Sequence, residues 1–359
     1  MNLKHLSVRY SRRDFGKLSL ASLSTAALMT PADMLASAPQ SKPNSVFGGV
    51  PIGAITPYSF GAEATTAGDI LKALITVGLS RAEIGNAAVE AFAGAPTPAP
   101  AGARANPPAP SSPAAARGGE GQAQGQGGGR RGGGRAPLTP EQQAAQQAAA
   151  QALAAWRATA PLDRIATLRR TYDEAGVTIA AFRITLTAAM TDVEYDYAFN
   201  AAKALGASSV TMELPSDSAV SQRIGQFATK HQTMVGYHLH TTATMTAWDQ
   251  ALAQSRHNGI QLDIGHYVAG TSESPIPFMQ KHHARITSLH LKDRKRANNT
   301  GVNMPWGQGD TPVAEVLQLM KKEGWRFPAF IELEYPVPEG STRVAEVAKC
   351  LAFARNALA

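Results

Sequence analysis

The sequence of 359 residues lacks the features that several protein classes require. Its single cysteine, Cys350, excludes a disulfide framework, a thiolate zinc cluster and a lipoprotein cysteine behind the leader. No stretch approaches the roughly 18 uninterrupted apolar residues of a membrane-spanning helix, so we expect no stable membrane insertion. No Gly-x-Gly-x-x-Gly follows the first predicted strand, which disfavours a dinucleotide-binding sheet. The chain is nevertheless 44% hydrophobic, enough for a sizeable core.

The basic character of the chain is confined to two stretches. Residues 1–17 carry five basic side chains against Asp14, and residues 88–136 carry five arginines against Glu90 and Glu120. These two excesses together equal the net charge of +7, so the remaining chain is neutral. A nucleic-acid-binding protein would need its basic residues on the folded domain itself. We therefore expect no nucleic-acid partner.

Residues 1–38 have the features of an export signal. The sequence Ser-Arg-Arg-Asp-Phe-Gly-Lys at residues 11–17 precedes a modestly apolar run at 18–30 that is too short to span a membrane. The arginine pair resembles the twin-arginine signal, and Ala-Ser-Ala at 36–38 resembles a cleavage site. An ordinary basic N-terminus is the alternative. The pattern predicts the twin-arginine export machinery as a partner and a periplasmic or secreted protein.

From residue 50 onward, short apolar runs alternate with longer amphipathic ones. The apolar runs predict eight strands, at residues 52–58, 81–85, 178–184, 209–214, 234–240, 261–265, 286–291 and 329–334. The amphipathic runs predict helices at residues 69–77, 162–175, 192–205, 219–230, 246–258, 276–283, 313–323 and 343–358. Eight such units predict a single α/β domain over residues 50–358, a (β/α)8 TIM barrel, with an open doubly wound sheet as the alternative.

An insertion interrupts the second unit. Residues 93–136 are mostly Ala, Pro, Gly and Arg, and predict a disordered low-complexity insert after strand two, because such a segment buries too little surface to offset its chain entropy. Its Gly–Arg run could hold RNA or an anionic surface, but no aromatic residue interleaves it, which favours a solvated linker. Residues 139–159 predict an extra helix, because Thr139 and Gln142 match a capping box around Pro140.

The C-terminal ends of the strands carry the active site in a TIM barrel. The last five predicted strands end in Met-Glu-Leu-Pro, Tyr-His-Leu-His, Leu-Asp-Ile-Gly-His, Leu-His-Leu-Lys-Asp and Ile-Glu-Leu-Glu. Alternate residues share a face, so we expect three pairs to point inward together: His238 with His240, His290 with Lys292, and Glu332 with Glu334. Each histidine alone is more often structural than a ligand. Charged groups that converge from five strands are costly unless a cation or a substrate matches them.

The residue types at these strand ends indicate the kind of ion. Carboxylates and imidazoles without thiolate suit one divalent metal ion, with Mn²⁺ as the first choice and Mg²⁺, Co²⁺ or Zn²⁺ as alternatives. The other histidines are poor candidates. His231 and His257 lie at the opposite barrel end, and His282 and His283 lie at a helix C-terminus, where the helix dipole favours cations.

The order of these motifs resembles a known group. Leu-Asp-Ile-Gly-His, Leu-His-Leu-Lys-Asp, Gly-Gln-Gly-Asp at 307–310 and Ile-Glu-Leu-Glu-Tyr together resemble the xylose-isomerase-like sugar phosphate isomerase/epimerase superfamily, over about residues 50–88 and 160–357. The resemblance implies one divalent ion held by side chains from strands five to eight. It puts Asp263, His290 and Glu332 on ligand positions, with Glu332 preferred over Glu334 as the first glutamate of its motif. It puts His266 on a substrate-contact position.

One position departs from the superfamily pattern. The epimerases carry glutamate on strand five, where this chain has His238, and they use that glutamate with the strand-eight glutamate as a pair of proton-transfer groups. His238 is therefore a predicted metal ligand. Glu213 on strand four then supplies the fourth ligand or the second base, or else the chemistry is not a symmetrical epimerisation.

The resulting hypothesis is proton abstraction next to a sugar carbonyl, by a sugar isomerase or epimerase that acts through an enediolate. Loss of a β-substituent from that enediolate would make the protein a 3-keto-glycoside lyase or hydratase. The predicted catalytic residues are Glu332, Glu334, Lys292 and Glu213, and the predicted contacts to the carbohydrate substrate are His266, His240 and Trp306.

Two other classes are weighed against this hypothesis. An endonuclease IV-like phosphoesterase would need three metals and a basic groove, which the neutral barrel disfavours. A non-catalytic sugar-binding barrel is disfavoured by the presence of both glutamates and Lys292.

Overall fold

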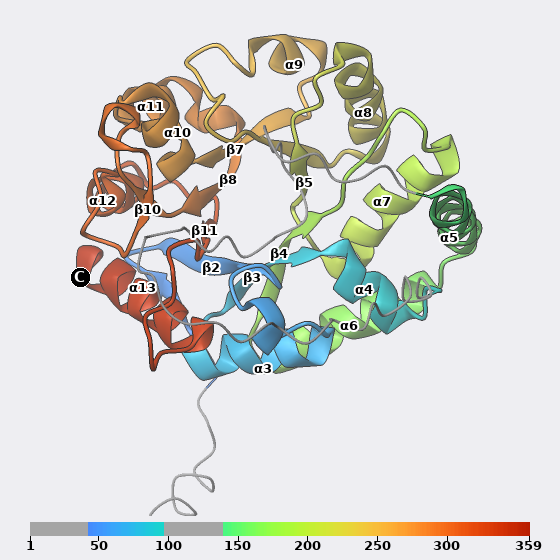
Figure 1. Cartoon of the computed structure of the whole chain (residues 1–359), viewed down its shortest axis with the longest axis horizontal. Helices are drawn as coiled ribbons and strands as arrows, with labels where there is room; N and C mark the ends of the chain where they lie inside the picture. Colours follow the sequence, from blue (N-terminus) through green and yellow to red (C-terminus); the bar gives the residue numbers. More distant parts are fainter. Residues whose placement is uncertain (1–41, 97–138) are drawn as a thin grey trace, which may run out of the picture. The chain divides into compact units, whose positions relative to one another are not determined.

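The computed structural model describes residues 42–96 and 139–359 (Figure 1). In this part of the chain, eight parallel strands close into a barrel because the last strand pairs with the first. In chain order they are β2 (Val50–Thr56), β3 (Arg81–Gly85), β4 (Thr178–Arg183), β5 (Ser209–Glu213), β6 (Met234–His238), β7 (Asn258–Asp263), β8 (Ile286–Leu291) and β11 (Ala329–Ile331). The predicted TIM barrel is confirmed, and the open sheet is excluded.

Shorter strands extend this framework. The strand β1 (Val46–Phe47) pairs antiparallel with β2, before the barrel begins. The strands β9 (Asp293–Arg294) and β10 (Asn303–Met304) form a separate antiparallel ribbon directly after β8. The barrel strand β11 ends at Ile331, three residues earlier than predicted, because Leu333 donates its amide to the Ser59 side chain rather than to a neighbouring strand. Glu332 and Glu334 therefore lie just beyond the strand.

Helices surround the barrel (Figure 1). They are α3 (Ala67–Val77), α4 (Asn86–Ala93), α5 (Pro140–Ala158), α6 (Leu162–Glu174), α7 (Asp192–Leu205), α8 (Ser218–His231), α9 (Asp249–Gln254), α10 (Ile264–Thr271), α11 (Ile276–His282), α12 (Val313–Glu323) and α13 (Arg343–Ala357). Within the described ranges, no helix combines the length and the apolar character needed to cross a membrane.

Several helix predictions are confirmed and others are corrected. The predicted capping box at Thr139 is present, and Thr191 forms a second capping box with Glu194 at the start of α7. The helices α4 and α10 were not predicted. The helix α9 is shorter than the predicted 246–258, because Ser255 already has extended backbone (φ −157°, ψ 142°) and Asn258 belongs to β7. The helix α12 begins after Pro312 without a side-chain cap, and the hydroxyl of the preceding Thr311 accepts the Arg294 amide.

The predicted extra helix is α5, which is anchored mainly by its last turn. Arg157 lies 2.9 Å from Glu90 of α4 and 3.4 Å from Glu194 of α7, and all three side chains are at least nine-tenths buried. Trp156 packs edge-to-face on Tyr197 of α7.

The first residue of the predicted insert belongs to a helix. Ala93 is 1% exposed and ends α4, so the predicted boundary at residue 93 is wrong. Ala93 ends a short helix and is followed by an alanine-rich stretch, so composition alone does not show where the helix ends and the insert begins. The predicted signal at 1–38 and residues 97–136 of the insert lie outside the described residues.

Candidate metal and active site

Side chains from β6, β7, β8 and the segment after β11 meet at the barrel mouth, the end formed by the C-termini of the strands. The register explains this meeting, because His238 pairs with Gln261 and Asp263 pairs with His290 along neighbouring strands. His238, Asp263 and His290 offer ligand atoms that all lie within 4.8 Å of one another. The Nδ1 atom of His290 lies 2.8 Å from Oε2 of Glu332. We call His238, Asp263, His290 and Glu332 the four-residue cluster.

The hydrogen-bond accounting of the four-residue cluster fits a cation. Each member has one buried side-chain atom without a hydrogen bond of acceptable geometry to the described residues: Nδ1 of His238, Oδ2 of Asp263, Nδ1 of His290 and Oε2 of Glu332. Three of these atoms lie in ion pairs, His290 with Glu332 at 2.8 Å and Lys292 with Asp263 and Glu332 at 2.9 and 3.1 Å. Buried polar atoms are nearly always satisfied, so Nδ1 of His238, which has no partner among the described residues, needs an explanation. Two imidazole nitrogens and two carboxylate oxygens suit Mn²⁺, Co²⁺ or Zn²⁺. The residues therefore fit the divalent ion that the sequence predicts.

Lys292 supplies the buried positive charge next to the cluster. Its Nζ lies 2.9 Å from Asp263, 3.1 Å from Glu332 and 2.7 Å from Glu334. Burial alone would lower the pKa of Lys292, but these carboxylates raise the pKa above its usual value. Tyr58 donates its hydroxyl to Oε1 of Glu334 at 2.8 Å, which fixes that carboxylate at the mouth.

Glu83 of β3 orients His290 from below. Its Oε2 lies 2.7 Å from Nε2 of His290, so Nδ1 is left to face Glu332. Glu83 is fully buried and also accepts from the Thr211 hydroxyl at 2.6 Å and the Gln261 amide at 3.0 Å. A carboxylate behind a metal-binding histidine fixes its tautomer and ring orientation. Sequence reasoning missed Glu83, although it is the single acidic residue in the run Arg-Ala-Glu-Ile-Gly of a predicted strand.

The pKa values of the cluster reflect burial and mutual charge. Burial would lower the pKa of His290, but Glu83 and Glu332 raise it to about 10. Burial would raise the pKa of Glu332, yet Lys292 and His290 hold it well below its usual range. Burial, with the positive charge of His290, lowers the pKa of His238 well below its usual value. His238 is therefore a neutral imidazole, the form that binds metals.

His266 lies on the first turn of α10, directly after Asp263. Oδ1 of Asp263 accepts the His266 amide at 2.7 Å and so caps the helix, which leaves Oδ2 directed at Lys292. The His266 ring has Nε2 3.0 Å from Lys292 and Nδ1 in contact with Arg294. Burial lowers the pKa of His266 well below its usual value, and both cations act in the same direction.

The remaining predicted residues lie further out. His240 stacks on His266 with ring centroids 4.5 Å apart and lies 3.2 Å from Glu213. The Glu213 side chain is 48% exposed and, of the described groups able to hold a metal, belongs to none. The geometry thus favours His238 over Glu213 as the fourth ligand. Trp306 packs edge-to-face on Phe353 of α13, and within the described ranges no ring contact or hydrogen bond joins it to the cluster.

Glycines in two sequence motifs make room for this arrangement. A Cβ at Gly265 would overlap the Lys292 side chain and lie 2.9 Å from the Lys292 carbonyl oxygen. A Cβ at Gly309 would overlap the Asp293 carboxylate, which accepts the amides of Gly307 and Gly309 at 2.8 Å. Asp293 therefore organises the Gly-Gln-Gly-Asp loop.

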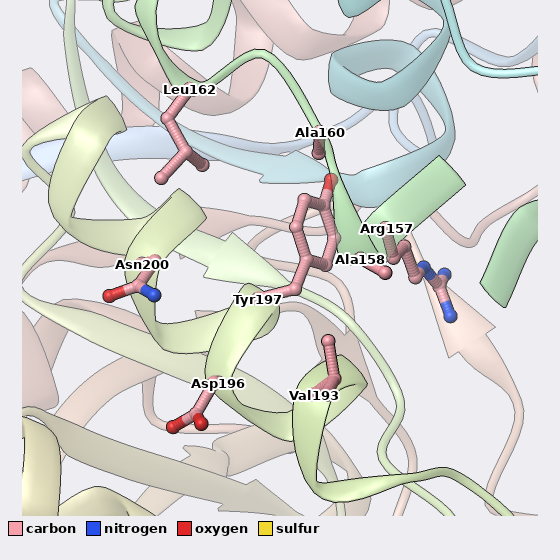
Figure 2. Close-up of a pocket in the computed structure, with 8 residues that line it drawn as sticks. All are labelled: Arg157, Ala158, Ala160, Leu162, Val193, Asp196, Tyr197 and Asn200. Atoms are coloured by element: carbon pink, nitrogen blue, oxygen red, sulfur yellow. The ribbon is translucent and has the colours of Figure 1, made fainter. Parts of the chain in front are cut away.

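A separate hollow lies on the outer side of the barrel, between α5 and α7 (Figure 2). Its lining includes Arg157, Tyr197 and Leu162, and contains no predicted site residue. The four-residue cluster and Lys292 therefore lie at the barrel mouth and not at this hollow.

Comparisons with known proteins agree with this architecture. Residues 222–356 match the family model described as xylose isomerase-like TIM barrel, which covers every member of the four-residue cluster. No curated protein matches the chain.

Solved structures of low sequence identity share the fold. A sugar phosphate isomerase/epimerase from Parabacteroides distasonis is 16% identical with a TM-score of 0.53, covering 89% of this chain and 99% of that one. A D-psicose 3-epimerase, solved in the presence of D-fructose, is 10% identical with a TM-score of 0.52, covering 86% and 99%. A probable 3-DHS dehydratase of petrobactin synthesis from Bacillus anthracis is 12% identical with a TM-score of 0.52, covering 84% and 99%.

Proposed function

We propose that the protein is a divalent-metal-dependent sugar isomerase or lyase of the xylose-isomerase-like group. The observation that carries the proposal is the convergence of two imidazoles and two carboxylates, the four-residue cluster, with their ligand atoms buried and close together beside a buried lysine. The family match and the isomerase, epimerase and dehydratase neighbours support this class of chemistry.

His238, Asp263, His290 and Glu332 would hold the ion. A bound divalent ion supplies Lewis-acid polarisation of the substrate carbonyl. Glu334 is the carboxylate placed to remove a proton next to that carbonyl, since it lies at the mouth and its side chain is 14% exposed. Lys292, within 3.1 Å of three carboxylates, supplies positive charge for the enediolate oxygen that develops. His266 and His240 then contact the sugar.

The arrangement favours isomerisation or elimination over epimerisation. Epimerisation through an enediolate needs two proton-transfer groups, one on each face of the sugar carbon. Glu332 and Glu334 both follow β11, while β6 supplies His238, a buried neutral imidazole. The strand across the barrel from β11 is β5, whose Glu213 is 48% exposed and pairs with His240 instead of facing the four-residue cluster. A single carboxylate that moves a proton on one face is sufficient for an aldose–ketose isomerase or a 3-keto-glycoside lyase.

The test is metal analysis combined with exchange of substrate hydrogen. The purified full-length protein, loaded with Mn²⁺, is incubated in deuterium oxide with a panel of ketoses and 3-keto-glycosides. We expect deuterium to enter the carbon next to the carbonyl, and Glu334→Gln to slow its entry by about 100-fold or more, the scale of general-base catalysis. Arg256→Gln, an exposed change at the opposite barrel end, is the control. Absence of exchange across the panel would refute the mechanism.

We also propose export through the twin-arginine route, on the basis of residues 11–38. Replacing Arg12 and Arg13 together with lysine should retain the protein in the cytoplasm, as measured by cell fractionation and immunoblotting. Equal export of both forms would contradict the proposal.

A further inference from the structure

Arg183, the last residue of β4, faces the barrel interior at the mouth. Its backbone pairs with Gly85 of β3, and two residues earlier Ala181 pairs with Glu83. The Glu83 side chain crosses the barrel interior to reach His290 of β8. Because alternate residues of a strand share a face, Arg183 lies on the same interior face as Glu83, one step nearer the mouth.

Gly85 leaves space for the guanidinium group. A Cβ at this position would lie 3.7 Å from Nη2 of Arg183 and 3.4 Å from the Thr56 carbonyl oxygen. A longer side chain at 85 would extend further into the interior and occupy the space beside Arg183. The guanidinium group of Arg183 therefore lies directly beside Gly85 on the neighbouring strand.

Arg183 forms no ion pair with the described part of the chain, and the nearest carboxylate it influences, Glu83, is already paired with His290. The Nε of Arg183 is buried and has no hydrogen-bond acceptor in this part of the chain, and none of the ion pairs at the mouth includes Arg183. Lys292, by contrast, has three carboxylates within 3.1 Å. Burial raises the pKa of Glu83, but His290 and then Arg183 lower it, so the guanidinium charge acts inside the barrel.

We propose that Arg183 binds an anionic group of the substrate, a sugar carboxylate or a sugar phosphate. A guanidinium presents paired donors that match the oxygens of either group, and a buried donor without an acceptor is costly until such a group arrives. The β4 strand lies across the barrel from β8, so an anion on Arg183 directs the rest of the sugar toward the four-residue cluster. This inference rests on the proposed function, because it assigns a substrate class to the same site.

The test uses three ketoses that differ only at carbon 6: fructose, fructuronate and fructose 6-phosphate. Their affinities for the full-length, Mn²⁺-loaded protein are measured by calorimetry, for the natural protein and for Arg183→Gln, Arg183→Lys and Arg256→Gln. We expect at least one anionic sugar to bind about 10–100-fold more tightly than fructose, the scale of a hydrogen bond to a charged group. Arg183→Gln should remove this preference and leave fructose binding within about twofold. Arg183→Lys should keep part of the preference for the anionic sugar, and Arg256→Gln should keep all of it.

The outcomes separate the inference from the proposed function. Tighter binding of fructuronate alone identifies a carboxylate, and tighter binding of fructose 6-phosphate alone identifies a phosphate. Equal affinities for the three sugars, or an equal loss for all three in Arg183→Gln, overturn the anion site even where deuterium exchange occurs. Anion preference that depends on Arg183 without any exchange supports the anion site and counts against the proposed function. Thermal melting of each variant shows whether it folds.

Discussion

Replacement of Glu83 by glutamine is the perturbation that best probes how the cluster is organised. The change keeps the shape of the side chain and removes the charge that lies 2.7 Å from Nε2 of His290. Loss of such an orienting carboxylate typically weakens metal binding by about 10–100-fold, or about 1.4–2.7 kcal/mol. Glutamine can keep the neighbouring hydrogen bonds, because its oxygen can accept from Gln261 and its amide can donate to the Thr211 hydroxyl, so the change mainly removes the charge.

A second consequence of this change runs in the opposite direction. Glu83 and Glu332 raise the pKa of His290 to about 10 despite its burial, so protons compete with the metal in the natural protein. Without the Glu83 charge, the pKa of His290 falls. Protons then stop competing with Mn²⁺ for the His290 imidazole at a lower pH than in the natural protein. Glu83→Gln should therefore weaken Mn²⁺ binding most at high pH, where proton competition no longer masks the loss, and should flatten the pH dependence.

Calorimetric titration with Mn²⁺ between pH 6 and pH 9 measures both effects. Glu346→Gln is a matched control. Glu346 lies on α13 and is also buried (2% exposed), but it accepts hydrogen bonds from the Tyr335 and Ser341 hydroxyls, away from the four-residue cluster. The control should bind Mn²⁺ like the natural protein. If Glu83→Gln keeps the natural affinity and the natural pH profile, Glu83 does not position His290.

Three further predictions concern other parts of the molecule. Arg157→Ala should destabilise the fold by about 3–5 kcal/mol in chemical denaturation, because it leaves the buried Glu90 and Glu194 without their cation; an unchanged midpoint would mean that α5 docks by other contacts. Burial raises the pKa of the Cys350 thiol to about 12, so a thiol reagent at pH 8 should label the unfolded chain but not the folded one, and stability from this group should fall as pH rises from about 8.5 toward 12. Mn²⁺ binding at pH 7 should release a proton from His290, so the calorimetric heat should vary with the ionisation enthalpy of the buffer; a heat that is the same in every buffer would contradict this.

The sequence predicted the barrel because its strands are short apolar runs separated by amphipathic helices. This alternation can be recognised in a single sequence, without related sequences for comparison. The strands β3 and β8 match their predicted bounds residue for residue. The short helices α4 and α10 escaped prediction, because eight residues give too few turns for a clear periodicity. The end of α4 also adjoins the alanine-rich stretch that composition assigns to the insert.

The site was partly predictable for a related reason. Strand-end motifs identified His238, Asp263, His290, Glu332 and Lys292, since alternation along a strand decides which residues face inward. Alternation does not give distances across a barrel. Glu83 lies 207 residues before its partner His290 in the chain, and only the closed geometry brings them together. Alternation along the strand also suggested Glu213 as a ligand or base, but Glu213 pairs with His240 near the surface.

We expect one divalent ion to bind His238, Asp263, His290 and Glu332 together. Anomalous diffraction at the manganese edge, from crystals of the Mn²⁺-loaded protein, tests it directly. The account predicts one strong peak per chain, about 2.0–2.3 Å from Nδ1 of His238, Oδ2 of Asp263, Nδ1 of His290 and Oε2 of Glu332. A peak elsewhere, or a loaded crystal with no peak among these four atoms, would contradict it.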